Sequence, residues 1–185
     1  MPLSCGGSGG DAPDGTVTDA GPTDSQPSDA PLPDGGGAGT VSGSVDGTPF
    51  TTVTTSYLIG APDSAETTVV FVFSKPVKCS DLATPGWDQR IADGTQLLEM
   101  KIFGKDPGAF KAVTTVTPAP GEASVNYTLS STAGTPKETG SSGGSVTLEA
   151  LAASTSAQGR FSLQFGASKL DGTFDAVFCP GGHEP

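Results

Sequence analysis

Hydrophobic and polar residues alternate along most of the chain after residue 40. Five segments carry an apolar residue at every second position: 98–102, 125–129, 146–148, 161–165 and 174–178. The side chains of a β-strand point alternately to its two faces, so this pattern predicts strands that each bury one face.

Two further regions complete the strand prediction. Residues 69–73 (VVFVF) are apolar at every position, which is typical of a central strand covered on both faces. Residues 41–45 and 50–59 are predicted to pair as a hairpin around Asp46 and Gly47, a dipeptide suited to a type I′ turn.

The predicted fold is therefore all-β. Clusters of Gly, Pro and Asp separate the strands at intervals of about 8–15 residues, which favours a single antiparallel β-sandwich or barrel-like domain of about nine strands over residues 41–180. Residues 181–185 are expected to be a flexible tail. The best helical signal is one turn capped by Ser80 or Asp81, which the Pro-Gly dipeptide at 85–86 would end.

Residues 6–40 differ in composition from the rest of the chain. They contain ten Gly, five Pro and six Asp, but no Lys, Arg or aromatic residue. Five of the aspartates lie at a strict five-residue interval: Asp14, Asp19, Asp24, Asp29 and Asp34. Such a segment buries too little apolar surface to offset the entropy of ordering it, so it is predicted to be a disordered acidic tether.

Cys5 precedes this tether and is the candidate for lipid modification. Leu3-Ser4-Cys5 looks like the end of a lipobox, but only four residues precede Cys5, and the apolar run of about 7–15 residues is missing. We expect residues 1–5 to be the remnant of a lipoprotein signal that starts further upstream. The alternative is an accidental cysteine in a cytosolic protein.

Cys79 and Cys179 are the other two cysteines, and we expect them to form a disulfide in an exported protein. The bridge would fasten loop 76–94 over the outer face or edge of the last strand. It would also cover the second apolar face of residues 69–73. The alternative is a pair of buried free thiols.

The chain is acidic, with a net charge of −11. The tether carries six of the negative charges, which leaves nine Lys and Arg against fourteen Asp and Glu, or −5, in the domain. Acidity in both parts argues against binding to nucleic acid and against adsorption to anionic lipid. No apolar run approaches the roughly 18 residues of a transmembrane helix.

Three short motifs carry a resemblance to a known group of proteins. They are SGSVDGTPF at residues 42–50, a cysteine shortly after a strand (Cys79), and GTFDAVFC at residues 172–179. In order and style they resemble uncharacterised lipoproteins of myxobacterial type. That resemblance implies a signal peptide, a lipid-modified cysteine, a low-complexity tether and a terminal β-domain, and it implies no known activity.

The sequence offers few catalytic groups. His183 is the only histidine, and it lies in the expected flexible tail, so His-dependent triads and zinc sites are not expected. Close carboxylates could hydrolyse a glycoside or bind calcium. The acidic candidates are Asp81, Asp88, Asp93, Asp171 and Asp175. No recognisable catalytic pair or calcium loop contains them, so we expect no catalytic residue, cofactor or metal.

The loop at residues 85–90 (PGWDQR) contains the only tryptophan. An aromatic ring beside polar groups is the kind of surface that stacks on a sugar or a peptide. Trp87, Asp88, Gln89 and Arg90 are therefore candidate ligand-binding residues. The alternative interpretation is that Trp87 folds back as a lid and fills the core.

Together these features predict a non-catalytic cell-envelope lipoprotein, in the outer membrane or exported, that serves as a surface binding or structural module. A lipid on Cys5 would attach it to the membrane. We expect a monomer whose partner is a carbohydrate or an envelope protein, not nucleic acid. The alternatives are a carbohydrate- or calcium-binding module built around Trp87 and a carboxylate-based hydrolase.

Overall fold

The computed structural model describes residues 35–60, 67–131 and 134–184. Cys5 and most of the predicted tether lie outside the described residues, as do residues 61–66, residues 132–133 and Pro185.

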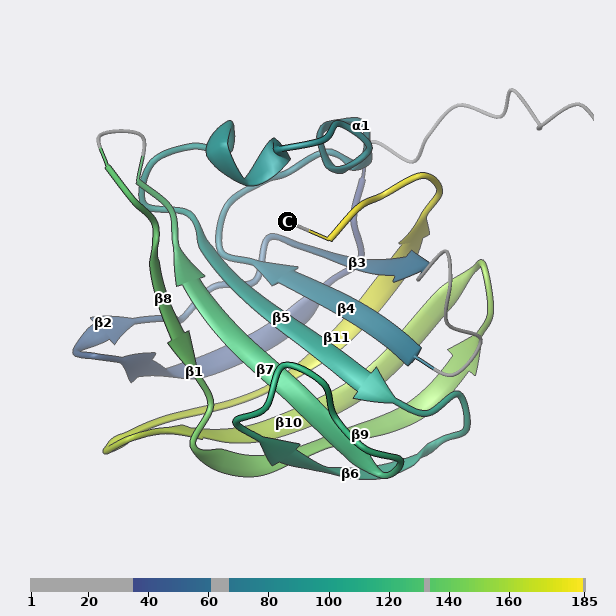
Figure 1. The fold of residues 1–185 in the computed structure, drawn as a ribbon. Helices are drawn as coiled ribbons and strands as arrows, with labels where there is room; N and C mark the ends of the chain where they lie inside the picture. The colour runs from purple at the N-terminus through teal and green to yellow at the C-terminus, as the bar shows by residue number, and fades with distance from the viewer. Residues whose placement is uncertain (1–34, 61–66, 132–133, 185) are drawn as a thin grey trace, which may run out of the picture. The chain divides into compact units, whose positions relative to one another are not determined.

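Strands make up most of the described chain and helices very little of it, which confirms the all-β prediction (Figure 1). The strands are β1 (Gly39–Val45), β2 (Thr48–Pro49), β3 (Thr55–Gly60), β4 (Thr67–Phe73), β5 (Gln96–Phe103), β6 (Gly108–Val113), β7 (Glu122–Leu129), β8 (Lys137–Gly140), β9 (Gly143–Ala152), β10 (Ser156–Phe165) and β11 (Ser168–Cys179). Between β4 and β5 lie two short helical turns, α1 (Cys79–Leu82) and the 3-10 turn η1 (Trp87–Gln89). The described residues contain no membrane-spanning helix.

The strand pairings close into a ring, so the barrel-like arrangement is the one that forms. Around the ring the order is β3, β4, β5, β7, β6, β9, β10 and β11, and β11 pairs again with β3. The short strands extend from this ring: β1 and β2 from the free part of β11, and β8 from β7. The sheet is mixed and not purely antiparallel, because β3–β11 and β6–β7 run parallel.

The alternating residues pack inside the ring, as the sequence predicted. Leu98, Met100 and Ile102 of β5 are buried there against the inward residues of the neighbouring strands. The sequence predicted about nine strands, and the described residues contain eleven. The predicted segments leave out β2, β6 and β8. Of these, β2 and β8 have only two and four residues, too few to produce a visible alternation.

The first predicted hairpin is shorter than expected. Asp46 and Gly47 both adopt positive φ, 49° and 78°, as a type I′ turn requires. Only Ser44–Pro49 and Val45–Thr48 then pair. The Phe50 N–H still donates to the Gly43 carbonyl at 3.0 Å, and the Phe50 side chain is fully buried in the interior.

The predicted tether, residues 6–40, includes residues at its C-terminal end that belong to the folded domain. Gly37 pairs with Ser56, and Gly39 and Thr40 begin β1 opposite β11. A Cβ on Gly37 would lie 1.5 Å from the Asp175 carbonyl oxygen. Glycine at this position therefore allows two backbones to approach closely, a role that composition cannot separate from linker flexibility.

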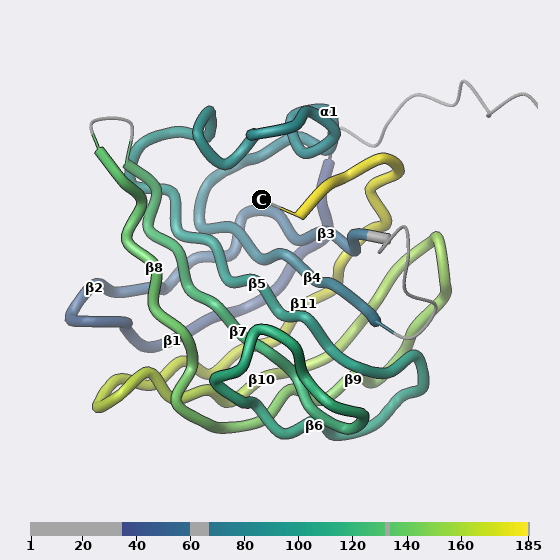
Figure 2. Tube along the Cα trace, in the orientation of Figure 1, coloured from purple at the N-terminus to yellow at the C-terminus, as the bar shows by residue number. Residues whose placement is uncertain are grey.

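The segment after β11, residues 180–184, is docked on the domain and is not the flexible tail that the sequence predicted. We call these residues the tail. The backbone N–H of His183 donates to the Leu82 carbonyl at 3.0 Å, and Gly182 is buried against Ile59 and Cys179. Figure 2 shows the tail turning back from the end of β11 toward α1 and β3.

Candidate functional site

The connection between β4 and β5, residues 76–94, crosses the outer face of the sheet, and we call it the strap. Its first helical turn begins at Cys79, which is bonded to Cys179 at the end of β11 with the two Cα atoms 5.5 Å apart. Both cysteines are fully buried. The predicted disulfide is confirmed, and it fastens the strap to the last strand.

The strap covers a second apolar cluster outside the ring, which we call the outer core. Its members are buried residues of the strap and of the strands beneath it: Tyr57, Ile59, Val69, Phe71, Phe73, Val77, Cys79, Leu82, Trp87, Ile91, Leu97 and Cys179. This cluster explains why residues 69–73 are apolar at every position. Val70 and Val72 face the interior, and the three residues between and beside them face the strap.

Trp87 is the centre of the outer core. Its ring is only 1% exposed and packs against Phe71 and Phe73, with ring centroids 5.5 Å and 5.9 Å away. The indole Nε1–H donates to the His183 carbonyl at 2.9 Å. Trp87 thus acts as a lid that fills the core, and in this structure its face is not open to a stacking ligand.

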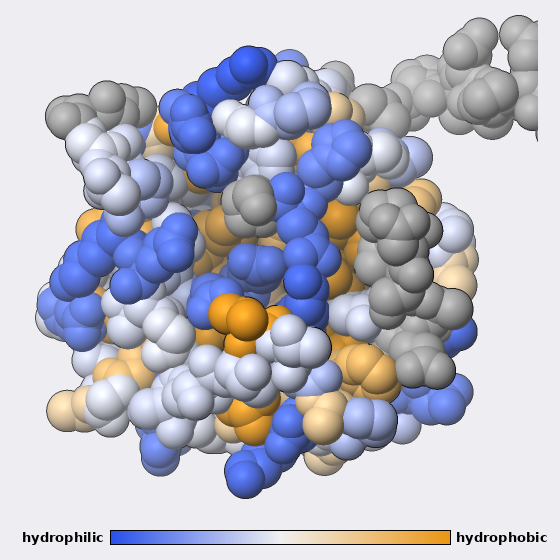
Figure 3. Space-filling model, in the orientation of Figure 1, coloured by the Kyte–Doolittle hydropathy of each residue, from blue (hydrophilic) through white to orange (hydrophobic). Residues whose placement is uncertain are grey.

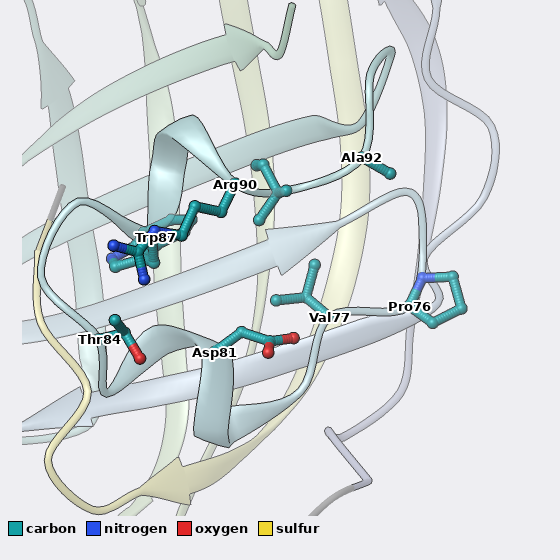
Figure 4. A pocket seen from close by; sticks show the side chains of 8 residues that line it. Pro76, Val77, Asp81, Thr84, Trp87, Arg90 and Ala92 are labelled. Carbon is teal, nitrogen blue, oxygen red and sulfur yellow. The ribbon is translucent and has the colours of Figure 1, made fainter. Parts of the chain in front are cut away.

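A pocket of about 200 Å³ opens within the strap (Figure 4). Eight residues line it: Pro76, Val77, Asp81, Thr84, Trp87, Arg90, Ile91 and Ala92. Asp81 and Arg90 reach it from different sides, Asp81 from α1 and Arg90 from the segment after η1. The pocket therefore combines a carboxylate, a guanidinium and a hydroxyl with apolar walls, a set that suits a small polar ligand.

The structure brings together only part of the predicted ligand-binding set. Trp87 and Arg90 line the pocket, whereas Asp88 and Gln89 do not. Sequence reasoning missed Thr84 and the apolar wall residues, because nothing in the sequence shows how α1 and η1 face each other. The one usable signal was Cys79, which marks where the strap is anchored.

The other acidic candidates do not form a site. Asp171 forms an ion pair with Lys169, with 3.0 Å between Lys169 Nζ and Asp171 Oδ2. The Lys169 ammonium group lowers the pKa of Asp171. Asp175 accepts a hydrogen bond from Gln158. In the part of the chain that the structure describes, no three His, Cys, Asp or Glu side chains gather as metal ligands. For the calcium alternative, these residues therefore offer no group of three carboxylate side chains.

The outer face of β5 carries an unusual carboxyl group, Glu99. Burial is the main cause that raises its pKa to about 7, and the negative charges of Glu184 and Glu138 raise it further while Lys101 lowers it. Figure 3 shows this side of the molecule, where apolar surface is visible in the hollow below the largely hydrophilic strap. Glu99 does not line the strap pocket.

The fold and the site define the class of protein: an all-β protein with a mixed sheet closed on itself and a disulfide-fastened strap over a second core. None of the protein-family models, curated proteins or solved structures compared with this chain matches it.

Proposed function

We propose that the protein is a non-catalytic module of the cell envelope, held at a membrane by a lipid on Cys5. The observation that supports this most directly is the buried Cys79–Cys179 disulfide. Structural disulfides form and persist in oxidising compartments. Once this pair is bonded, Cys5 is the one remaining cysteine in the sequence, and it stands next to a Gly-, Pro- and Asp-rich segment suited to a tether.

The anchor is tested on protein isolated from the native host. Intact-mass analysis should find diacylglycerol and acyl groups at Cys5, and a Cys5→Ser variant should move from the membrane fraction to the soluble fraction. A Cys5 thiol without lipid, in a protein with a normal disulfide, would contradict the anchor.

The second candidate function is the binding of a carbohydrate in the strap pocket. The favourable observation is that the polar side chains of Asp81, Thr84 and Arg90 line one pocket together with the apolar side chains of Val77 and Ile91. Sugars combine hydroxyl groups with apolar ring faces, and such a lining can serve both. Asp81 is the only carboxylate among the lining residues, so the pocket lacks the carboxylate pair that a glycoside hydrolase would use.

Glycan-array binding tests this second function. Arg90→Ala and Thr84→Val should each remove a ligand contact and weaken binding by about tenfold, the effect of one or two hydrogen bonds. Gln89→Ala is the matched control, since Gln89 is exposed on the same strap but outside the pocket. Binding that is absent in the native protein, or equally strong in all three variants, would contradict the proposal.

A further inference from the structure

The tail is held to the outer face by three polar contacts that come from different elements. The His183 N–H bonds the Leu82 carbonyl of α1, and the His183 carbonyl accepts from the Trp87 indole. Glu184 forms an ion pair with Lys101 of β5. The tail therefore joins the strap to the barrel directly beside Trp87.

A second carboxyl group competes for the same lysine. Glu99 lies two residues before Lys101, on the same outer face of β5, because side chains at i and i+2 of a strand share a face. The charged groups that act on Glu99 are Lys101 on its own strand, Glu138 on β8 and Glu184 on the tail. Two of these three are negative, so an ionised Glu99 would repel the tail and attract its lysine.

The coupling between Glu99 and the tail must be reciprocal. Burial is the main cause that raises the pKa of Glu99 to about 7, and the negative charge of Glu184 raises it further. Binding of a proton by Glu99 and docking of Glu184 therefore favour each other, since a coupling free energy acts equally in both directions. Below neutral pH Glu99 is uncharged, so the Lys101 ammonium group pairs with Glu184 alone. Above neutral pH the ionised Glu99 weakens that ion pair.

We propose that the tail is a pH-sensitive latch, closed over Trp87 when Glu99 is protonated and released when Glu99, Lys101 and Glu184 are all charged. Release removes the acceptor of the Trp87 indole N–H and the donor to Leu82, both of which belong to the strap. Because Trp87 is also a wall of the strap pocket, the latch controls the stiffness and accessibility of that pocket. The latch operates whether or not the pocket binds a carbohydrate.

The protein carries its own probe for this motion, because Trp87 is its only tryptophan. Acrylamide quenching of Trp87 fluorescence is measured on the full chain from about pH 5 to about pH 9, two units on either side of the Glu99 pKa of about 7. The quenching constant should rise at least about twofold through a single transition near neutral pH, and the emission should shift to longer wavelength as the ring becomes wetter. Far-UV circular dichroism should stay constant, which distinguishes release of the tail from unfolding.

Three variants test whether the pH-dependent change in Trp87 quenching comes from Glu99. Glu99→Gln should keep the low quenching constant across the whole range, because its side chain cannot ionise. Glu184→Gln removes both the ion pair and the repulsion, so its quenching should not depend on pH. His183→Gln leaves the tail backbone contacts in place and should titrate like the native protein, which separates Glu99 from the imidazole of the tail.

Glu149→Gln is the matched control, because this exposed carboxylate pairs with Arg160 elsewhere on the sheet, and it should behave like the native protein. A native protein whose quenching is constant over the range would overturn the proposal. So would a transition that persists unchanged in Glu99→Gln or disappears in His183→Gln.

Discussion

At the scale of single residues, Glu99 shows how a tertiary environment changes a group that the sequence makes ordinary. In the alternation of residues 98–102 it is simply the polar partner of two buried neighbours. In the fold it is half-buried beside Glu138 and Glu184. The sequence predicts its face of the strand, but neither β8 nor the tail could be placed next to it from sequence.

This environment makes folding stability depend on pH. The pKa of Glu99 rises from 4.5 to about 7 in the fold, so between these values the unfolded chain has lost a proton that the folded chain retains. Ionised Glu99 is disfavoured only in the fold. The effect of Glu99 ionisation on the free energy of unfolding is therefore absent below about pH 4.5. The free energy of unfolding falls as pH rises toward 7 and stays at the lower value above it.

Glu99→Gln should remove this dependence. Urea unfolding at several pH values should show the variant gaining stability relative to the native protein as pH rises from about 4.5 to about 7, with a constant difference above that range. Asp106→Asn, an exposed carboxyl in the turn between β5 and β6, is the control and should follow the native protein. A difference that shrinks with rising pH would contradict a raised pKa of Glu99 in the fold.

At the scale of elements, β10 and β11 are fitted together by two reciprocal glycine–phenylalanine pairs. Gly159 lies opposite Phe174, and Phe161 lies opposite Gly172. A Cβ on Gly159 would come within 2.5 Å of the Phe174 ring, and one on Gly172 within 2.6 Å of the Phe161 ring. Each ring thus covers the backbone of the opposite strand, which leaves room for both in the core.

Gly159→Ala and Gly172→Ala should therefore each destabilise the fold by about 1–3 kcal/mol, the usual cost of overpacking a core. Both added methyl groups would also meet a backbone oxygen at 2.2 Å, that of Thr147 or Thr40. Chemical denaturation measures the loss. Gly134→Ala is the control, because an added Cβ there meets nothing within 4 Å. Equal stability of all three variants would contradict this account of the β10–β11 contact.

In the strap, the sequence predicts the local features but not the orientation of Trp87. The cysteine of the strap, its helical turn and its position over residues 69–73 were predictable, because each follows from local chemistry. The orientation of Trp87 was left open between a binding surface and a lid. The outer core decided it: burying the ring against Phe71 and Phe73 removes a large apolar surface from water.

At the scale of the whole molecule, the disulfide joins residues 100 positions apart. In the chain-entropy description, a loop of this length stabilises the folded state by about 4–5 kcal/mol. Cys79→Ala combined with Cys179→Ala should lose about that much in the free energy of unfolding, measured by denaturant titration. Cys5→Ser, which leaves the bridge intact, should lose nothing. A double variant as stable as the native chain would contradict the stabilising role of the bridge.

The boundary of the folded unit gives a second prediction at this scale. A chain that begins at residue 35 keeps the Gly37–Ser56 pairing and the bond from the Asp175 N–H to the Ala38 carbonyl. A chain that begins at residue 41 loses them. The shorter chain also leaves the N–H and the carbonyl of the fully buried Ser56 without their partners on Gly37.

The shorter chain should therefore be less stable by about 2–4 kcal/mol, the sum of a few backbone hydrogen bonds. Thermal unfolding of the two truncated chains, compared with the full chain, measures the difference. The chain from residue 35 serves as the control and should unfold with the full chain. If both truncated chains unfold together, the first residues of β1 contribute nothing to the fold.

By itself, the sequence determined the all-β class, the inward faces of the main strands, the cysteine pair and the double coverage of residues 69–73. These properties depend on local alternation and on residue chemistry, which act wherever the strand lies. Only the tertiary structure decided the parallel pairings of β3–β11 and β6–β7, the docking of the tail and the burial of Trp87. These depend on which distant segments meet, and short polar segments such as β8 and residues 180–184 carry no periodic signal that specifies their partners.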